Sequence, residues 1–244
     1  MTAFERLPPA DPNSPLLFLC DHASAALPPA HGRLGLDPAL FATHIASDLG
    51  AAAVTRALAA RFGAGAILGA WSRLLIDLNR GEDDPTLVMK LSDGSIIPGN
   101  RDAGPDEVAA RLRDYYQPYH AAITAELDRI GPGAAIISIH SFTPVWKGTP
   151  RPWEVGVLWD TDRRLAGPLM ARLSQHAFLY GDNEPYSGAL ENDCLNRHGT
   201  KRGLPHVLIE IRQDLIATDA MALDFAGRLY HTLAAAIGDM ERVR

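Results

Sequence analysis

Short apolar runs of strand length recur along the chain and alternate with stretches that have helical periodicity. Strands are predicted at residues 15–20 (PLLFLC), 66–69, 73–78, 134–139 (AAIISI), 155–159, 177–180 and 207–211 (VLIEI). Apolar runs of this length, bounded by turn-forming residues, are typical of strands buried in a sheet. Residues 1–14 are a Pro-rich lead-in, and residues 81–104 are dense in Gly, Asp and Pro, which predicts a long loop.

Helical patterns separate these strands. One is predicted over 37–62, because Asp37 can cap a helix that has Pro38 at its first position and Gly63 as its stop. Further helices are predicted over 105–130, bent or split by Pro118, and near 162–175 and 218–237. Strands that alternate with helices predict a three-layer α/β/α fold with a mixed, mostly parallel sheet. No repeat or linker divides the chain, so residues 1–244 are predicted to form a single domain.

The composition of the chain excludes several classes of protein and of binding partner. The chain is 47% hydrophobic, which is enough apolar surface to exclude disorder as its main state. No apolar run approaches the roughly 18 residues of a membrane span, and the net charge of −6 argues against a nucleic-acid partner. Cys20 and Cys194 cannot build a disulfide framework, which favours a reducing cytoplasm. The expected partner is a small molecule, and the sequence leaves the oligomeric state open.

Polar side chains gather where the predicted strands end. The residues in question are Asp21, His22, Asn79, Arg80, His140, Glu210 and Arg212. Ligands of open α/β sheets bind beyond the carboxyl ends of the strands, so these side chains are expected to converge. A histidine at one strand end is usually structural, but several such ends together indicate a site.

Histidine with a carboxylate is the ligand set of a hydrolytic zinc site. His22 and His140 are the candidate nitrogen ligands. Asp48 is the candidate third ligand, because the predicted helix places it on one face with His44, in apolar surroundings where a carboxylate needs a partner. A surface or capping contact of Asp48 is an equally good interpretation at this point.

Glu210 and three polar residues of segment 72–80 (SRLLIDLNR) are the candidates for chemistry and substrate binding. Glu210 interrupts an apolar strand, and near a metal it can act as general base and acid; the alternative is a buried ion pair with an arginine such as Arg212. Asn79 and Arg80 can clamp an anion. Arg73 can reach a developing oxyanion, or simply pair with Asp77 or Glu82.

Other nucleophiles are less favoured. Cys20 lies two residues before His22, but a cysteine at a strand end is usually buried and inert, so a thiolate amidase is disfavoured. Ser24 and Ser141 lack the G-x-S-x-G elbow of many serine hydrolases. His120 is interpreted as a core or supporting residue. His198, in a basic turn, either contacts an anionic substrate or is solvated.

With these residues in place, the sequence resembles the N-formylglutamate amidohydrolase family. The matching stretches are CDHAS (20–24), HIASDLGA (44–51), SRLLIDLNR (72–80), YYQPYH (115–120), IHSFTP (139–144), DNEPYSG (182–188) and LIEIRQDL (208–215). They occur in the family's order across nearly the whole chain. The resemblance implies a fold similar to zinc carboxypeptidases and aspartoacylases, one zinc ion per chain, and hydrolysis of an N-acyl amino acid.

The resemblance also implies residue roles. His22 and His140 match the metal histidines, Glu210 matches the carboxylate that handles water, and Arg73 matches the arginine at the scissile carbonyl. Asn79 and Arg80 match the pair that holds a substrate carboxylate, and Tyr186 is expected to cap the substrate from a mobile loop. Zinc carboxypeptidases take a ligand from a Glu three residues after the first His; that position is Ala25 here, and Asp48 is the natural substitute.

The expected activity is a zinc-dependent cytoplasmic amidohydrolase of amino-acid catabolism that converts N-formyl-L-glutamate, or a close analogue, to formate and glutamate. The alternative is a metal-dependent binding or sensor protein for carboxylate ligands that has lost catalysis. Glu210 discriminates between these classes, since a binding protein needs no general base.

Overall fold

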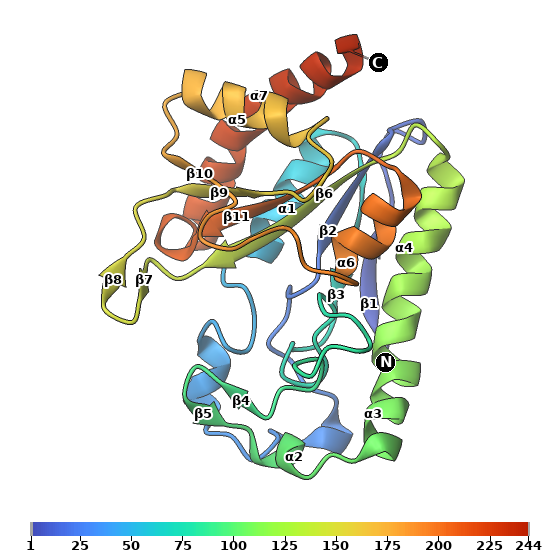
Figure 1. Ribbon diagram of the computed structural model, residues 1–244, viewed down its shortest axis with the longest axis vertical. Coiled ribbons are helices and arrows are strands. Elements are labelled where there is room, and N and C mark those ends of the chain that lie inside the picture. The colour runs from blue at the N-terminus through green and yellow to red at the C-terminus, as the bar shows by residue number, and fades with distance from the viewer. Residues whose placement is uncertain (1, 244) are drawn as a thin grey trace.

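A seven-stranded mixed β-sheet forms the centre of the protein, seen here in a computed structural model that describes residues 2–243 (Figure 1). In spatial order its strands are β1 (Phe4–Leu7), β3 (Gly65–Gly69), β2 (Leu16–Cys20), β6 (Ala135–Phe142), β11 (His206–Arg212), β9 (Val155–Leu158) and β10 (Tyr180–Asp182). Strands β3, β2, β6 and β11 are parallel to one another. Strand β1 is antiparallel to β3, while β9, with its parallel neighbour β10, is antiparallel to β11. The predicted mixed, mostly parallel sheet is confirmed.

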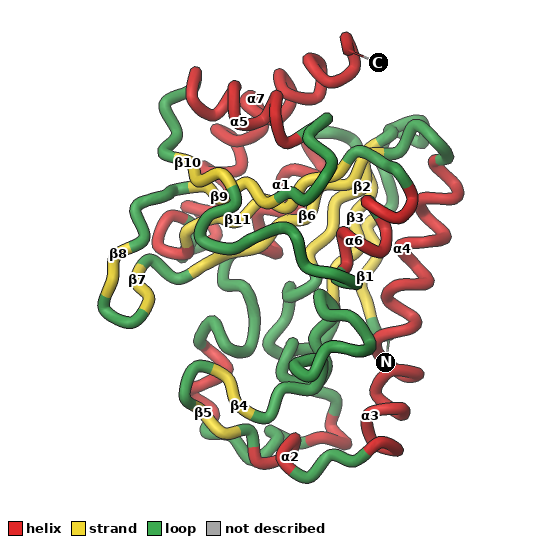
Figure 2. The backbone as a smooth tube through the Cα atoms, viewed as in Figure 1, coloured by secondary structure: helices red, strands yellow, loops and turns green. Residues whose placement is uncertain are grey.

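Helices cover both faces of this sheet, which gives the predicted three layers (Figure 2). One face is covered by α1 (Ala51–Arg61), α5 (Ala166–Gln175) and α7 (Asp219–Val243), and the other by α4 (Gln117–Ile130) and α6 (Cys194–His198). Helix α3 (Pro105–Arg111) precedes α4 and lies beyond the end of the sheet, near α2 (Pro98–Arg101) (Figure 1). Strand β2 contributes side chains to the hydrophobic layers on both faces of the sheet, because successive side chains of a strand point to opposite faces. Phe18 packs in the first layer, Leu17 and Leu19 pack in the second, and all three are fully buried.

The remaining elements are short. They are the hairpins β4 (Leu91–Ser92) with β5 (Ser95–Ile96) and β7 (Val145–Trp146) with β8 (Thr149–Pro150), the helix α2 (Pro98–Arg101), and single 3₁₀ turns at Pro29–His31, Pro38–Ala42, Thr200–Arg202 and Gln213–Leu215. Hairpin β4–β5 and α2 lie inside the predicted loop of 81–104. Within residues 2–243, none of the helices has the length and apolar character needed to cross a membrane.

The predicted helix over 37–62 is wrong in its first half. The Asp37 side chain caps a 3₁₀ turn at Pro38–Ala42, accepting a hydrogen bond from the Ala39 amide, but this turn stops after Ala42. The Thr43 hydroxyl donates to the Leu40 carbonyl, 2.7 Å away, and Thr43 itself has an extended backbone. A regular helix begins only at Ala51, after Gly50 in the left-handed region at φ 79°. A Cβ at Gly50 would also lie 2.3 Å from the Ile216 carbonyl oxygen, so this turn requires glycine.

The predicted strand over 73–78 is also wrong, because this segment is a series of turns with buried apolar side chains. Two of its carbonyl groups accept hydrogen bonds from side chains rather than from a neighbouring strand. The Asn100 amide donates to the Leu74 carbonyl, and the Arg111 guanidinium donates to the Leu75 carbonyl. Burial without sheet pairing explains why the apolar run mimics a strand.

Three smaller differences complete the comparison. The lead-in contains the edge strand β1, and the strand predicted at 177–180 starts only at Tyr180, after Ala177 at a positive φ of 58°. The pattern over 105–130 is split as predicted: a π-helical stretch at Leu112–Tyr116 joins α3 to α4, just before Pro118. Helix α6 lies in a region where no helix is predicted.

Candidate active site

A cavity of about 360 Å³ opens at the carboxyl ends of the parallel strands. All eight residues predicted from the sequence line it, namely His22, Asp48, Arg73, Asn79, Arg80, His140, Tyr186 and Glu210. Strand register explains part of this convergence, since His140 of β6 lies directly beside Glu210 of β11. We call this space the site cavity. Its volume is at the lower end of the range found for small-molecule sites.

The two histidines and Asp48 form one compact group of possible metal ligands. Their ligand atoms lie within 4.8 Å of one another, and all three residues are buried. Oδ2 of Asp48 is 2.8 Å from Nδ1 of His140 and 3.4 Å from Nδ1 of His22. The imidazole rings meet edge to face at an interplanar angle of 82°. Both Nδ1 atoms therefore face the same carboxylate oxygen, which is an N,N,O set typical of a zinc site.

The opposite nitrogen of each ring is held by a second buried carboxylate. Nε2 of His22 lies 2.7 Å from Oδ1 of Asp77, and Nε2 of His140 lies 3.0 Å from Oδ2 of Asp21. Ligating histidines commonly donate their other N–H to a carboxylate, which fixes the tautomer and the ring orientation. With Nε2–H held in this way, displacement of the Nδ1 proton by a metal ion would leave the Nδ1 lone pairs of both rings directed at the ligand position.

The balance of charge also fits a divalent cation. Asp21, Asp48 and Asp77 are three buried carboxylates, and Arg73 is the guanidinium that pairs with two of them. Burial acts to lower the pKa of His140, but its bonds to Asp21 and Asp48 hold that pKa well above the usual value. The protein thus draws positive charge to this point, because buried charges require partners. The residues present fit a divalent metal ion.

Glu210 faces the same cavity without a partner of its own. Its alternation along β11 is as predicted, since Ile209 and Ile211 pack in the opposite layer. Within residues 2–243, the buried Oε2 of Glu210 accepts no hydrogen bond, and Arg212 pairs with Asp214 instead. Burial raises the pKa of Glu210 to about 7. A carboxyl group with these properties is suited to exchanging protons near neutral pH.

Arg73 lies beside the ligand group rather than apart from it. Its Nη2 donates to Oδ2 of Asp77 over 2.7 Å, and its Nη1 lies 3.6 Å from Oδ1 of Asp48. The predicted pairing with Asp77 is therefore present, and the pairing with Glu82 is not, because Glu82 bonds to Arg197. The guanidinium still lines the site cavity, so it can serve the carboxylates and a ligand together.

Asn79 and Arg80 lie side by side at the cavity wall. Oδ1 of Asn79 accepts a hydrogen bond from the amide of Cys194 over 3.2 Å, which fixes the side-chain amide. Arg80 donates through Nη1 to the Asn79 carbonyl and through Nε to the Thr86 hydroxyl. Among residues 2–243 neither Nδ2 of Asn79 nor Nη2 of Arg80 has a hydrogen-bond acceptor. Both groups can donate to an anionic ligand.

Tyr186 lies in the loop that follows β10 and is 44% exposed at the cavity rim. Its hydroxyl accepts a hydrogen bond from Nη1 of Arg151 over 3.1 Å, and the same guanidinium stacks over the Tyr186 ring. The side chain can therefore lie across a bound ligand while Arg151 limits its orientation.

Three further residues considered from the sequence, His44, Cys20 and His198, do not have the positions expected of functional groups at this site. His44 is not on a helix face with Asp48, since that helix is absent; it pairs instead with Asp93 at 3.3 Å. Cys20 is fully buried in the core, where burial raises its pKa well above the usual value, so it is unsuited to nucleophilic attack. His198 is neither solvated nor part of the site cavity, because it is buried against His120.

Asp21 and Asp77 are the residues whose supporting roles the sequence reasoning missed. Asp21 was visible as a strand-end residue directly before His22, and Asp77 as a carboxylate near Arg73. What the sequence does not contain is the distance between each carboxylate and a histidine nitrogen. Tyr119 adds a further link, because its hydroxyl donates to Oδ1 of Asp21 over 2.6 Å.

Comparison with solved structures places this architecture among known proteins. The chain is similar to a gene product from Agrobacterium tumefaciens, with 34% identity, 99% of this chain and 97% of the other covered, and a TM-score of 0.91. It is similar to an N-formylglutamate amidohydrolase from Ralstonia eutropha, with 20% identity, complete coverage of both chains and a TM-score of 0.75. It shares its fold with a bacteriophage poly-gamma-glutamate hydrolase at 11% identity, 97% and 91% coverage and a TM-score of 0.50.

A comparison with curated proteins finds no match. The family model for N-formylglutamate amidohydrolase matches residues 14–217, a range that includes every residue of the site described above. The chain therefore belongs to the N-formylglutamate amidohydrolase family and is a hydrolase that acts on amides.

Proposed function

We propose that this protein is a zinc-dependent amidohydrolase that cleaves the amide of an N-acyl amino acid, with N-formyl-L-glutamate or a close analogue as substrate. One observation carries the proposal. Two histidine Nδ1 atoms converge on Oδ2 of Asp48 in the same cavity that holds the unpartnered Glu210 carboxyl group. A ligand set beside an available proton acceptor is the minimum that metal-assisted amide hydrolysis requires.

His22, Asp48 and His140 would hold the metal. A divalent cation bound there supplies Lewis acidity, which polarises an acyl carbonyl and lowers the pKa of water to roughly 7. This role needs three protein ligands and an open position, and these three residues border the site cavity.

Glu210 would move the proton. It accepts a proton from the attacking water as the new C–O bond forms at the acyl carbon. It then delivers that proton to the amide nitrogen as the C–N bond breaks, so the amine leaves in neutral form. A pKa raised to about 7 by burial suits both steps, because the group exchanges protons readily near neutral pH.

Arg73 would stabilise the oxyanion, since a cationic donor fixed before the reaction favours charge that develops in the transition state. Asn79 and Arg80 would bind a substrate carboxylate through the free Nδ2 and Nη2 donors. Tyr186 would close over the bound molecule.

Glutamate is proposed as the amino acid of the substrate because of the family and because the name of the Ralstonia eutropha structure specifies N-formylglutamate. A cavity of about 360 Å³ with two arginines at its wall agrees with a small anionic amide.

Formate release tests this proposal. Chelator-treated protein is assayed with N-formyl-L-glutamate, with and without added zinc, and formate is measured. We expect release that depends on zinc. If zinc binds at this site but no formate is released, the substrate is another N-acyl amino acid. Assays with a panel of N-acyl amino acids would then identify it. Neither release nor zinc binding would favour the carboxylate-binding alternative.

A further inference from the structure

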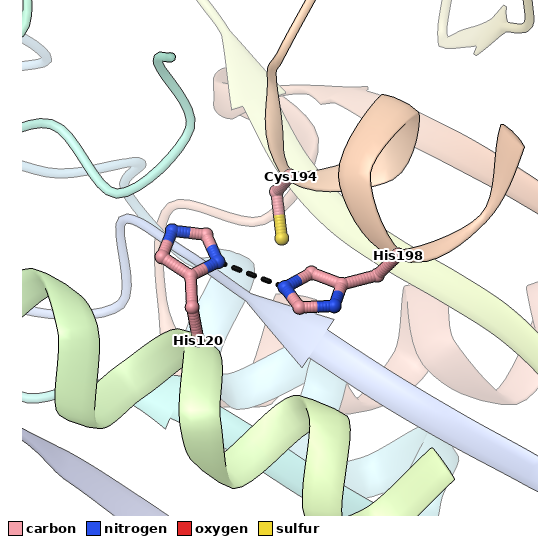
Figure 3. A group of neighbouring side chains, drawn as sticks. All are labelled: His120, Cys194 and His198. Carbon is pink, nitrogen blue, oxygen red and sulfur yellow. Dashed lines mark hydrogen bonds between the residues drawn. The ribbon is translucent and has the colours of Figure 1, made fainter. Parts of the chain in front are cut away.

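A second group of potential metal ligands lies between α4 and α6, outside the residues of the proposed reaction. His120 projects from α4, and Cys194 and His198 project from α6 (Figure 3). Cys194 and His198 are four residues apart on the helix, so they share the face that is turned towards α4. All three residues are buried.

The three side chains converge on one point. Nδ1 of His120 and Nε2 of His198 are 2.8 Å apart, and their rings are stacked at an interplanar angle of 17°. Figure 3 shows the Cys194 sulfur pointing towards the space between the two rings. All three ligand atoms lie within 4.8 Å of one another, close to the separations of ligands around one tetrahedral ion.

The protein itself satisfies the nitrogens of these two imidazoles poorly. Among the described residues 2–243, no group forms a hydrogen bond with the buried Nε2 of His120. The two rings share one hydrogen bond, which leaves their polar atoms only partly satisfied.

A surface hollow leads to this group. His120 and His198 line a hollow of about 370 Å³ together with Gln117, Arg197 and Arg202. The arginines do not leave it strongly positive, because Arg197 pairs with Glu82 and Arg202 pairs with Asp128. The hollow supplies a path for an ion and room for water as a fourth ligand.

We propose that His120, Cys194 and His198 form a second metal site, which takes a divalent ion that accepts both sulfur and nitrogen ligands, with zinc as the preferred ion. On binding, the Cys194 thiol releases its proton to solvent and the thiolate sulfur donates its electron pair to the ion. The ring that donates the His120–His198 hydrogen bond loses that proton to solvent and takes one up on the nitrogen that faces away, while the other ring already carries its proton there. The His120–His198 hydrogen bond is replaced by two nitrogen–metal bonds.

This site would fix α6 against α4 behind the wall of the site cavity. The Cys194 amide donates to Oδ1 of Asn79, and Tyr119, the neighbour of His120, donates to Asp21. An ion bound to Cys194 and His120 would therefore also fix the positions of the Cys194 amide, which orients Asn79, and of Tyr119, which orients Asp21. The role is one of positioning, and it does not depend on the proposed reaction.

Cobalt substitution tests the site directly. Metal-free full-length protein is titrated with Co²⁺ and its near-ultraviolet absorption is recorded. A thiolate bound to Co²⁺ gives a sulfur-to-metal charge-transfer band, whereas the His22–Asp48–His140 group contains no sulfur. We expect the band in the wild type and its loss in Cys194→Ser, with one fewer equivalent of tightly bound metal. His120→Ala should weaken the band in the same direction.

Two variants serve as controls. Cys20→Ser removes the other cysteine and should keep the band, and His22→Ala disrupts the first site and should also keep it. If Cys194→Ser does not fold, crystals of the wild type soaked in zinc should show an anomalous peak between His120 and His198. Absence of the band in the cobalt-saturated wild type, or its survival in folded Cys194→Ser, would overturn the proposal.

Discussion

Nε2 of His22 lies 2.7 Å from Oδ1 of Asp77, whose other oxygen accepts a hydrogen bond from Arg73 over 2.7 Å. Asp77 is fully buried, and its pKa is held well below the usual range: burial acts to raise it, but Arg73 and His22 outweigh that effect. One carboxylate thus orients a candidate metal ligand and the candidate oxyanion donor together. The geometry of both depends on a residue that does not line the site cavity.

Replacement of Asp77 by asparagine should therefore weaken metal binding without removing a ligand. Supporting carboxylates of this kind typically contribute about 10–100-fold to metal affinity. We expect the zinc dissociation constant of Asp77→Asn to rise by that factor, measured by competition with a chromophoric chelator. Asp83→Asn, an exposed carboxylate of the following turn, is the matched control and should leave the constant unchanged. Equal affinity in the two variants would contradict this role of Asp77.

Glu210→Gln should separate binding from turnover. The amide is nearly the same size as the carboxyl group but cannot accept a proton from water, so the loss falls on the chemical step. General acid–base groups contribute typically about 10²–10⁴-fold, and we expect kcat for formate release to fall within that range. Zinc stoichiometry should be unchanged.

The control for this variant is Glu154→Gln, which lies outside the site cavity and bonds to the Leu179 amide. Normal turnover by Glu210→Gln would exclude Glu210 as the proton carrier.

Arg80→Ala should reveal which substrate carboxylate the Asn79–Arg80 pair holds. A hydrogen bond to a charged group contributes about 1.5–3 kcal/mol, so kcat/KM for N-formyl-L-glutamate should fall by about 10–100-fold. The same variant is then assayed with N-formyl-L-glutamine, which lacks the side-chain charge. An undiminished penalty with this amide would assign the pair to the α-carboxylate, and a much smaller one to the side-chain carboxylate. No penalty with either substrate would contradict a clamp at Arg80.

The strand ends were predictable because apolar runs and their polar neighbours are local features of the sequence. His22 follows β2, while His140 and Glu210 lie in β6 and β11, and the parallel topology brings them together. Asp48 lies beside the two histidines, but the helix face from which it was inferred is not formed. Asp48 reaches the site from a turn whose amide donates to the His22 carbonyl.

Segment 72–80 shows why the rest could not be predicted. Its apolar pattern suits a strand, yet its buried carbonyl groups are satisfied by Asn100 and Arg111, which come from elements much later in the chain. Hydrogen bonds between such distant side chains and backbone groups leave no periodic signal. The second ligand group is hidden for the same reason, since His120 and Cys194 are 74 positions apart and become neighbours only through packing of α4 on α6.

Asn100 is the test of how segment 72–80 is held. Its Nδ2 donates to the carbonyls of Leu74 and Met89, and its Oδ1 accepts from Nη1 of Arg111. Alanine leaves these buried groups without partners, and each unsatisfied group destabilises by about 1–3 kcal/mol. We expect Asn100→Ala to lower the free energy of unfolding by about 3 kcal/mol, within the upper range for single substitutions.

At roughly 2–4 °C per kcal/mol for a chain of this size, the melting temperature of Asn100→Ala should fall by about 6–12 °C in a calorimetric scan. Asn13→Ala removes an exposed amide and should stay within about 0.5 kcal/mol of the wild type. Because Leu74 directly follows Arg73, whose guanidinium donates to Asp77, the weakened segment should also loosen Asp77, and zinc affinity should fall in the folded variant. An Asn100→Ala protein with wild-type stability would mean that apolar burial alone holds the segment in its turns.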